Sequence, residues 1–187
     1  MVSPAPAPGW DCRWPDPVAL KVATDRILAA RPEDDTDLNR RLAVTVRMEV
    51  PGQDGDPVSA ILVTPWAVER VFWHFNGSSA TPPIRFASEL EFDLQGRVAA
   101  GQGVILESSQ RTYPVVIAWE PETGHHFVQT LLHEVHAFHS VEKAIQSALS
   151  GNTPRGRITQ ASMAATLDKE VSRRGLFSLG SLFGRRD

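Results

Sequence analysis

The stretch of sequence that decides the fold comprises AVTVRMEV (43–50), PGQDGD (51–56) and, after one proline, VSAILVT (58–64). Apolar and polar residues alternate in the first segment, which is typical of a strand with one buried face. The last segment is apolar through its middle, as expected of a strand that is buried on both faces. The composition between them favours a turn. These residues therefore predict a β-hairpin.

Further strand-like segments follow the hairpin. Residues 66–75 place apolar side chains at every second position near their end. Residues 85–94 are ambiguous, because their apolar residues indicate neither a helix nor a strand clearly. Apolar and β-branched composition predicts three more strands, at residues 104–106, 113–119 and 126–135. The last of these can pair back on the strand before it.

Two helices are predicted beside these strands. Asp16 is a suitable N-cap and Pro17 a suitable first residue for a helix that ends before Pro32. Ser140 caps a second helix that Gly151 ends. The expected apolar faces are Val18, Val22, Ile27 and Ala29 in the first helix, and Val141, Ala144, Ile145 and Leu149 in the second. The pattern indicates an α+β fold: a mostly antiparallel sheet of about five strands, flanked by an N-terminal and a C-terminal helix and followed by a basic tail.

Composition divides the chain into three parts. We expect a flexible Pro-rich arm (1–16), a single globular domain (17–151) and a basic, partly disordered tail (152–187). The net charge is −3, but residues 151–187 carry +4, which leaves −7 for the rest. This asymmetry suggests a separate role for the tail. An acidic body is also unsuited to nucleic acid.

Three features favour a cytoplasmic protein. The longest apolar runs, residues 60–63 and 115–119, are far shorter than the ~20 residues of a membrane span. The first residues lack the basic and apolar regions of a secretory signal. Cys12 is the only cysteine, which excludes an internal disulfide or a thiolate metal cage.

The histidines offer a candidate metal site. His133, His136 and His139 follow one another at intervals of three, and neutral imidazole is a good ligand for nickel or zinc. On a helix the three rings would share one face, whereas on a strand His133 and His136 would point to opposite faces. The spacing differs from His-Glu-x-x-His. Exposed histidines near a turn are the favoured interpretation, and a metal site is the alternative.

The sequence shows no catalytic constellation. It contains neither Gly-x-Ser-x-Gly nor a P-loop. Cys12 has no activating neighbour beyond Arg13. We therefore expect a protein that is not an enzyme and needs no cofactor.

Five tryptophans are unusual in a chain of this length. Trp66 and Trp73 are more typical of a core than of a contact surface. Trp10 and Trp14 lie in an arm too rich in proline to form its own core. They must therefore either attach the arm to the body or bind a partner.

The end of the chain reads SRRGLF (172–177) and SLGSLFGRR (178–186). Arginine pairs lie on both sides of an apolar block. Such a segment can bind in a groove or lie on a membrane surface, so membrane contact is at most peripheral. The Ser-Arg-Arg-x-Leu-Phe order is similar to the twin-arginine export signature, which acts at the N-terminus.

The apolar strand that leads into Thr64-Pro65-Trp66, together with this tail, resembles the HybE/HupJ family of nickel–iron hydrogenase accessory proteins, which includes HoxT-like members. The resemblance spans roughly residues 17–187. It implies a cytoplasmic chaperone that binds a hydrogenase subunit precursor before assembly and export. The small, iron–sulfur subunit, which carries a twin-arginine signal, is favoured over the large subunit.

A rubredoxin-like or another maturation protein is a further candidate partner under this resemblance. Two alternatives stay open: a histidine-based metal-binding protein or metalloenzyme, and a peripheral membrane adaptor that acts through its tail. The candidate partner-binding residues are Thr64, Pro65, Trp66, Trp73, Arg173, Arg174, Leu176, Phe177, Leu182 and Phe183.

Overall fold

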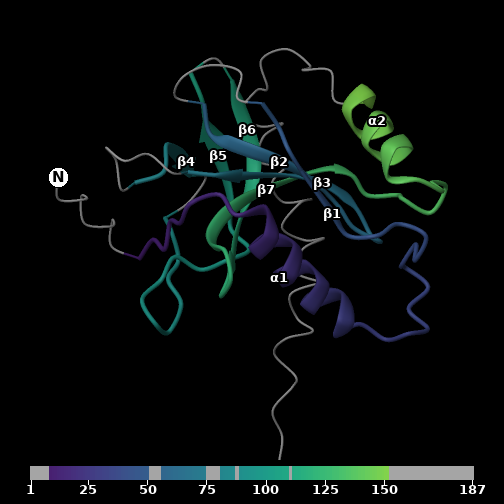
Figure 1. Ribbon diagram of the computed structural model, residues 1–187. Helices are drawn as coiled ribbons and strands as arrows, with labels where there is room; N and C mark the ends of the chain where they lie inside the picture. Colours follow the sequence, from purple (N-terminus) through teal and green to yellow (C-terminus); the bar gives the residue numbers. More distant parts are fainter. Residues whose placement is uncertain (1–8, 51–55, 75–80, 87–88, 110, 152–187) are drawn as a thin grey trace, which may run out of the picture.

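An antiparallel sheet with one helix on each face forms the body of the protein (Figure 1). The computed structural model describes residues 9–50, 56–74, 81–86, 89–109 and 111–151. Its elements are α1 (Pro17–Ala29), β1 (Thr45–Met48), β2 (Val58–Val63), β3 (Val68–Trp73), β4 (Ile84–Phe86), β5 (Gly103–Glu107), β6 (Thr112–Glu120), β7 (Gly124–Leu132) and α2 (Val141–Gly151). The strand order is β1-β2-β3-β7-β6-β5-β4.

The α+β class and the antiparallel sheet are confirmed, because every pair of neighbouring strands is antiparallel. The predicted number of about five strands is roughly compatible with the sheet but not exact, because the described residues form seven. The unrecognised strand β4 has three residues and pairs only with β5. Such a short edge strand offers too few residues for a periodic pattern.

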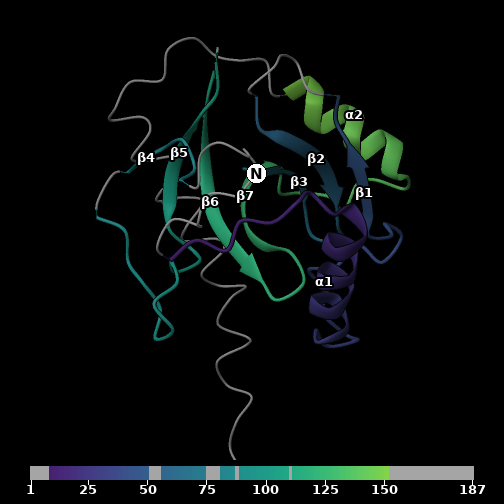
Figure 2. The same ribbon diagram turned by 60° about the vertical axis from the view of Figure 1, so that its left-hand side comes forward.

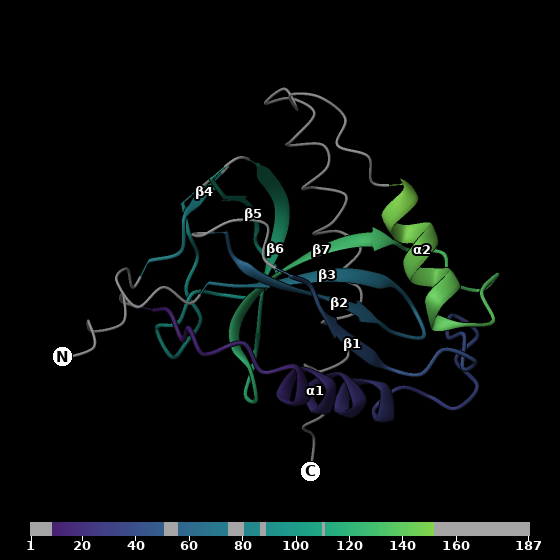
Figure 3. The same ribbon diagram turned by 45° about the horizontal axis from the view of Figure 1, so that its top comes forward.

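The predicted hairpin is confirmed as β1 and β2, in which Val46 pairs with Leu62. The apolar run of β2 has a structural cause. Leu62 packs in a cluster beneath α1, whereas Ile61 and Val63 pack beneath α2. Because successive side chains of a strand point to opposite faces, β2 is covered on both. Figure 2 and Figure 3 show the two helices on opposite sides of the sheet.

The start of α1 is as predicted. The carboxylate of Asp16 accepts hydrogen bonds from the amides of Val18 at 2.9 Å and Ala19 at 3.0 Å, and Pro17 is the first helical residue. These contacts satisfy two of the amides that a helix start leaves unpaired.

The predicted apolar face of α1 is wrong. Val18 and Val22 are 70% and 52% exposed, and the buried residues are Leu20, Ala23 and Thr24. The hydroxyl of Thr24 donates to the Leu20 carbonyl at 2.8 Å, which lets a polar residue lie on the buried face. Because α1 has apolar residues on both sides, spacing alone does not identify the side that meets the sheet.

α2 begins where the sequence places it, with the Lys143 amide donating to the Ser140 hydroxyl at 3.4 Å. Ala144 and Ile145 are buried as predicted, whereas Leu149 is exposed and Ala148 is buried in its place. No helix in the described residues has the length and apolar character needed to cross a bilayer.

Candidate functional site

Thr64, Pro65 and Trp66 form the tight turn between β2 and β3. The Thr64 amide and hydroxyl both donate to the Ala67 carbonyl, at 2.9 and 3.0 Å. The same hydroxyl accepts the amides of Ala67 at 2.9 Å and Trp66 at 3.3 Å. Thr64 is fully buried. Its hydroxyl therefore closes the turn, and a residue without one would leave buried amides unpaired.

Neighbouring segments hold this turn in place. The Asn39 amide donates to the Pro65 carbonyl at 2.7 Å. The Asn39 side chain donates to the carbonyls of Val135 and Phe138, both at 2.8 Å. One buried asparagine thus ties together the turn, the segment before β1 and the loop before α2.

Trp66 is the member of the Thr-Pro-Trp motif that keeps accessible surface. It is partly exposed, whereas Thr64 and Pro65 are buried. The guanidinium carbon of Arg31 lies 5.4 Å from the Trp66 ring centroid, a distance typical of a cation–π contact. Arg31 in turn pairs with Asp35 at 2.8 Å. The arrangement fixes a large aromatic ring at the surface of the molecule.

Trp73 is placed in the core and not at a contact surface. It is 1% exposed and packs in the cluster beneath α1. In this conformation it cannot touch a partner, which runs against the partner-binding role predicted for it. The candidates of the tail, Arg173, Arg174, Leu176, Phe177, Leu182 and Phe183, lie outside the described residues.

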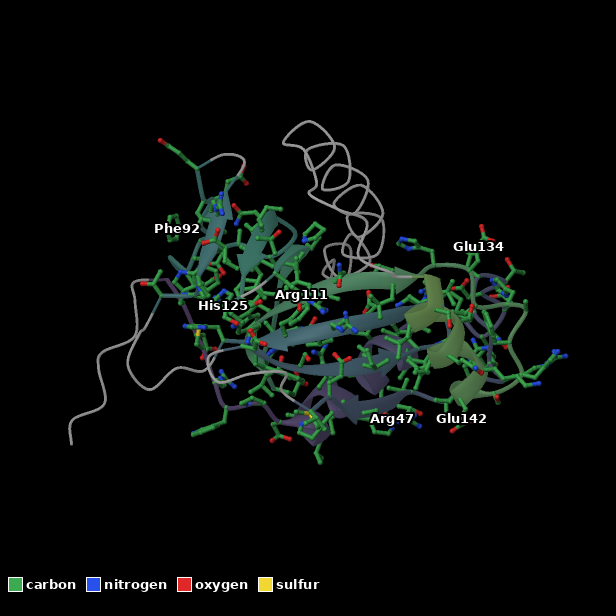
Figure 4. All side chains as sticks on the ribbon, turned by 90° about the horizontal axis from the view of Figure 1, so that it is seen from above. Arg47, Phe92, Arg111, His125, Glu134 and Glu142 are labelled. Carbon is green, nitrogen blue, oxygen red and sulfur yellow. The ribbon has the colours of Figure 1, made fainter. Side chains whose placement is uncertain are left out.

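The structure separates the histidines. His125 and His126 are buried at the start of β7, whereas His133, His136 and His139 are exposed beyond its end. His133 lies seven residues after His126, so about 23 Å of extended chain separates the two groups. Figure 4 shows His125 and Glu134 at opposite ends of the sheet. Within the part of the chain that the structure describes, no group of three or more His, Cys, Asp or Glu side chains could hold a metal ion.

Sequence reasoning missed a second constellation, in which residues 9–13, here called the strap, pair with the start of β7. The Asp11 amide donates to Nδ1 of His125 at 2.8 Å, and the His125 amide donates to the Asp11 carbonyl at 2.7 Å. Nδ1 must therefore be unprotonated, so the ring proton is on Nε2. Nε2 donates to the Val98 carbonyl at 2.9 Å. Both ring nitrogens are thus engaged, and neither is available for proton transfer.

Aromatic packing holds the strap from its other end. Trp10 is 8% exposed and meets the His125 ring edge-on, with centroids 5.0 Å apart. It also contacts Phe127 at 5.9 Å. Trp10 therefore attaches the arm to the body, which is one of the two roles the sequence left open. Trp14, by contrast, is 70% exposed. Residues 9–13 of the predicted arm (1–16) are thus packed against the body.

Charge also orders the strap. The Asp11 carboxylate pairs with Arg13 at 2.7 Å and accepts the indole N–H of Trp119 at 3.1 Å. The hydrogen bond with Arg13 is the main cause of a lowered Asp11 pKa. Burial, with a contribution from Asp11, raises the pKa of the Cys12 thiol to about 11. A thiol of this kind stays protonated near neutral pH and is a poor nucleophile.

A signal for the strap was present in the sequence. Gly9 and Gly124 both have positive φ, at 83° and 66°, and a Cβ on Gly124 would lie 2.3 Å from the Asp11 carbonyl oxygen. Only glycine allows so close an approach of two backbones. The sequence shows a tryptophan in a Pro-rich arm and a glycine before His125. It does not show that the arm pairs with the start of β7, more than one hundred residues away.

Comparisons of this chain with protein-family models, with curated proteins and with solved structures give no match.

Proposed function

We propose that this protein is an accessory protein of nickel–iron hydrogenase assembly that binds a hydrogenase subunit precursor in the cytoplasm. The small, iron–sulfur subunit with its twin-arginine signal is the favoured client. The proposal rests on the resemblance carried by Thr64-Pro65-Trp66 and on one structural observation. That observation is the partly exposed ring of Trp66 on a turn whose other residues are buried.

The geometry around Trp66 suits binding. Thr64 closes the turn, and Asn39 holds the Pro65 carbonyl. The ring therefore loses little conformational freedom when a partner covers it. Tryptophans held in this way are frequent anchors of protein interfaces. A binding role of this kind needs no catalytic side chain. In the strap, hydrogen bonds occupy both ring nitrogens of His125, and Cys12 is a protonated thiol. Neither residue is therefore an activated base or nucleophile.

Co-purification tests the proposal. The full-length chain, tagged at its N-terminus, is expressed in a hydrogenase-producing cell, and the retained proteins are identified by mass spectrometry. We expect the small-subunit precursor. A preparation free of every hydrogenase subunit would overturn the proposal, and recovery of the large subunit alone would overturn the choice of client.

A variant tests the role of Trp66. Trp66→Ala should lower the amount of retained client by about tenfold or more, because an interface tryptophan contributes at least about 2 kcal/mol. Leu94→Ala is the matched control, because Leu94 is a fully exposed apolar residue in the 93–96 turn. Leu94→Ala should keep the unfolding temperature of the parent, whereas Trp66→Ala removes a partly buried ring and its contact with Arg31 and should lower it. Retention is therefore compared well below the unfolding temperature of both variants. Equal retention by Trp66→Ala and the parent would exclude Trp66 as the anchor.

A further inference from the structure

The outer face of α1 is apolar although it does not contact the sheet. Val18 and Val22 are 70% and 52% exposed, and a spacing of four places them on the same side of the helix. Ala29 lies near this side and is also exposed. Trp14, three residues before the helix, is 70% exposed. Exposed apolar residues gathered along one element are typical of an interaction surface.

The charges around this face are acidic at both ends. Asp16 lies exposed at the start of α1, and Glu33 and Asp34 lie exposed after its end. Between them, Lys21 forms an ion pair with Asp25. Arg26, four residues after Val22 on the same side of the helix, pairs with both Glu120 and Glu122, so it leaves no unpaired positive charge on this face. The complementary ligand is therefore an apolar segment with basic residues on both sides.

The size of the face excludes a large partner surface. α1 has 13 residues, which is a length of about 20 Å, and a helix is about 10 Å wide. A stable dimer buries roughly 800 Å² on each partner, which is well beyond one face of such a helix. A short segment on the same chain needs less area, because attachment raises its effective concentration.

The chain contains a segment of this composition outside the described residues. In residues 172–186, arginine pairs precede and follow an apolar block whose largest residues are Leu176, Phe177, Leu179, Leu182 and Phe183. Twenty residues, 152–171, connect it to the end of α2. Fully extended they span up to about 70 Å, whereas a domain of this size has a radius of gyration of about 15 Å. The segment can therefore reach any part of the body.

We propose that the outer face of α1 binds the chain's own segment 172–186. The apolar block covers Val18 and Val22, and the arginine pairs lie near the acidic ends of the face. The inference rests on the chain alone and is independent of any hydrogenase client. A partner segment with the same combination of apolar and basic residues would compete for this face.

Cross-linking of the full-length chain tests the proposal. The photoreactive amino acid p-benzoylphenylalanine replaces Phe183, the protein is irradiated at low concentration, and the linked peptides are identified by mass spectrometry. We expect links within one chain to residues 14–29. The same probe at Thr159, outside the apolar block, should give far fewer links there. Links elsewhere, no links, or links between two chains would each overturn the proposal.

A pair of variants tests the face itself. Replacing both Val18 and Val22 with lysine should lower the yield of this cross-link by about tenfold or more, because it removes apolar contact and adds repulsion toward arginine. The matched control replaces Gln146 and Ser150 with lysine, four residues apart on the exposed side of α2. Both proteins should unfold at the parental temperature, because all four positions are exposed. A parental yield in the valine variant would refute the assignment.

Discussion

His125 connects the strap to the body, because its ring bonds both the Asp11 amide and the Val98 carbonyl. Replacing it with leucine removes both ring nitrogens from a side chain that is 2% exposed. The Asp11 amide and the Val98 carbonyl then lose their partners. Each buried unpaired group costs about 1–3 kcal/mol. Because Asp11 is partly exposed, water can replace some of this loss, and we expect the free energy of unfolding to fall by about 2–4 kcal/mol.

An asparagine at the same position separates the two contacts. The side-chain oxygen of His125→Asn can accept the Asp11 amide in place of Nδ1. The shorter side chain cannot reach the Val98 carbonyl. His125→Asn should therefore lose roughly half as much stability as His125→Leu.

The pH dependence supplies a second readout. Burial is the main reason why the pKa of His125 lies below its usual range, and Arg97 acts in the same direction. The Val98 carbonyl, Asp11 and Asp93 oppose it. The unfolded chain takes up the proton at about pH 6.5. The contribution of the neutral ring to stability is therefore complete above about pH 6.5, and falls as the pH drops through that value toward the lower pKa of the folded state.

Urea titrations between about pH 5 and pH 8, followed by circular dichroism, measure both effects. The parent should lose stability on acidification more steeply than either His125 variant. His136→Leu is the control, because His136 is exposed and should change stability by less than about 0.5 kcal/mol. The reasoning fails if His125→Leu unfolds at the parental urea concentration and keeps the parental pH slope.

Three further outcomes follow from the described contacts. Gly124→Ala should lower the free energy of unfolding by more than about 2 kcal/mol, because the added Cβ would collide with the strap. Gly96→Ala has open space around it and should cost only about 1 kcal/mol, because of its positive φ. Urea titration measures both changes. Cys12 should react slowly with iodoacetamide near pH 8, because its pKa is about 11, and faster in Trp10→Ala, which loosens the strap; equal rates would contradict the role of the aromatic contact. Asn39→Ala should lower the free energy of unfolding by about 2–3 kcal/mol, because the carbonyls of Val135 and Phe138 and the amide of Arg41 lose their hydrogen-bond partner; a change within error would show that water replaces the side chain.

The sequence was sufficient for local structure. The Asp16-Pro17 start of α1, the hairpin of β1 and β2, and the Ser140 cap all depend on neighbouring residues, and all are present. The side of α1 that meets the sheet was not predictable, because Leu20 and Val18 are equally apolar. Only the position of the sheet decides which of them is buried.

The candidate site divides in the same way. Thr64-Pro65-Trp66 was identified from sequence, and the hydrogen bonds of Thr64 explain why this order of residues forms the turn. Trp73 was considered more typical of a core and was also a candidate for partner binding; its 1% exposure places it in the core. The strap was missed because Asp11 and His125 are 114 residues apart, and no local pattern marks their contact.

The central pairing of the sheet has a consequence for synthesis of the chain. Val71 in β3 pairs with Val128 in β7, 57 residues further along. On the ribosome, α1 and the first three strands emerge before β7, so β3 remains an unpaired edge while the residues between Trp73 and Gly124 are added. Unpaired edges are prone to association with other chains. A nascent chain that stops before residue 124 would expose this edge and would also lack the residues that hold the strap.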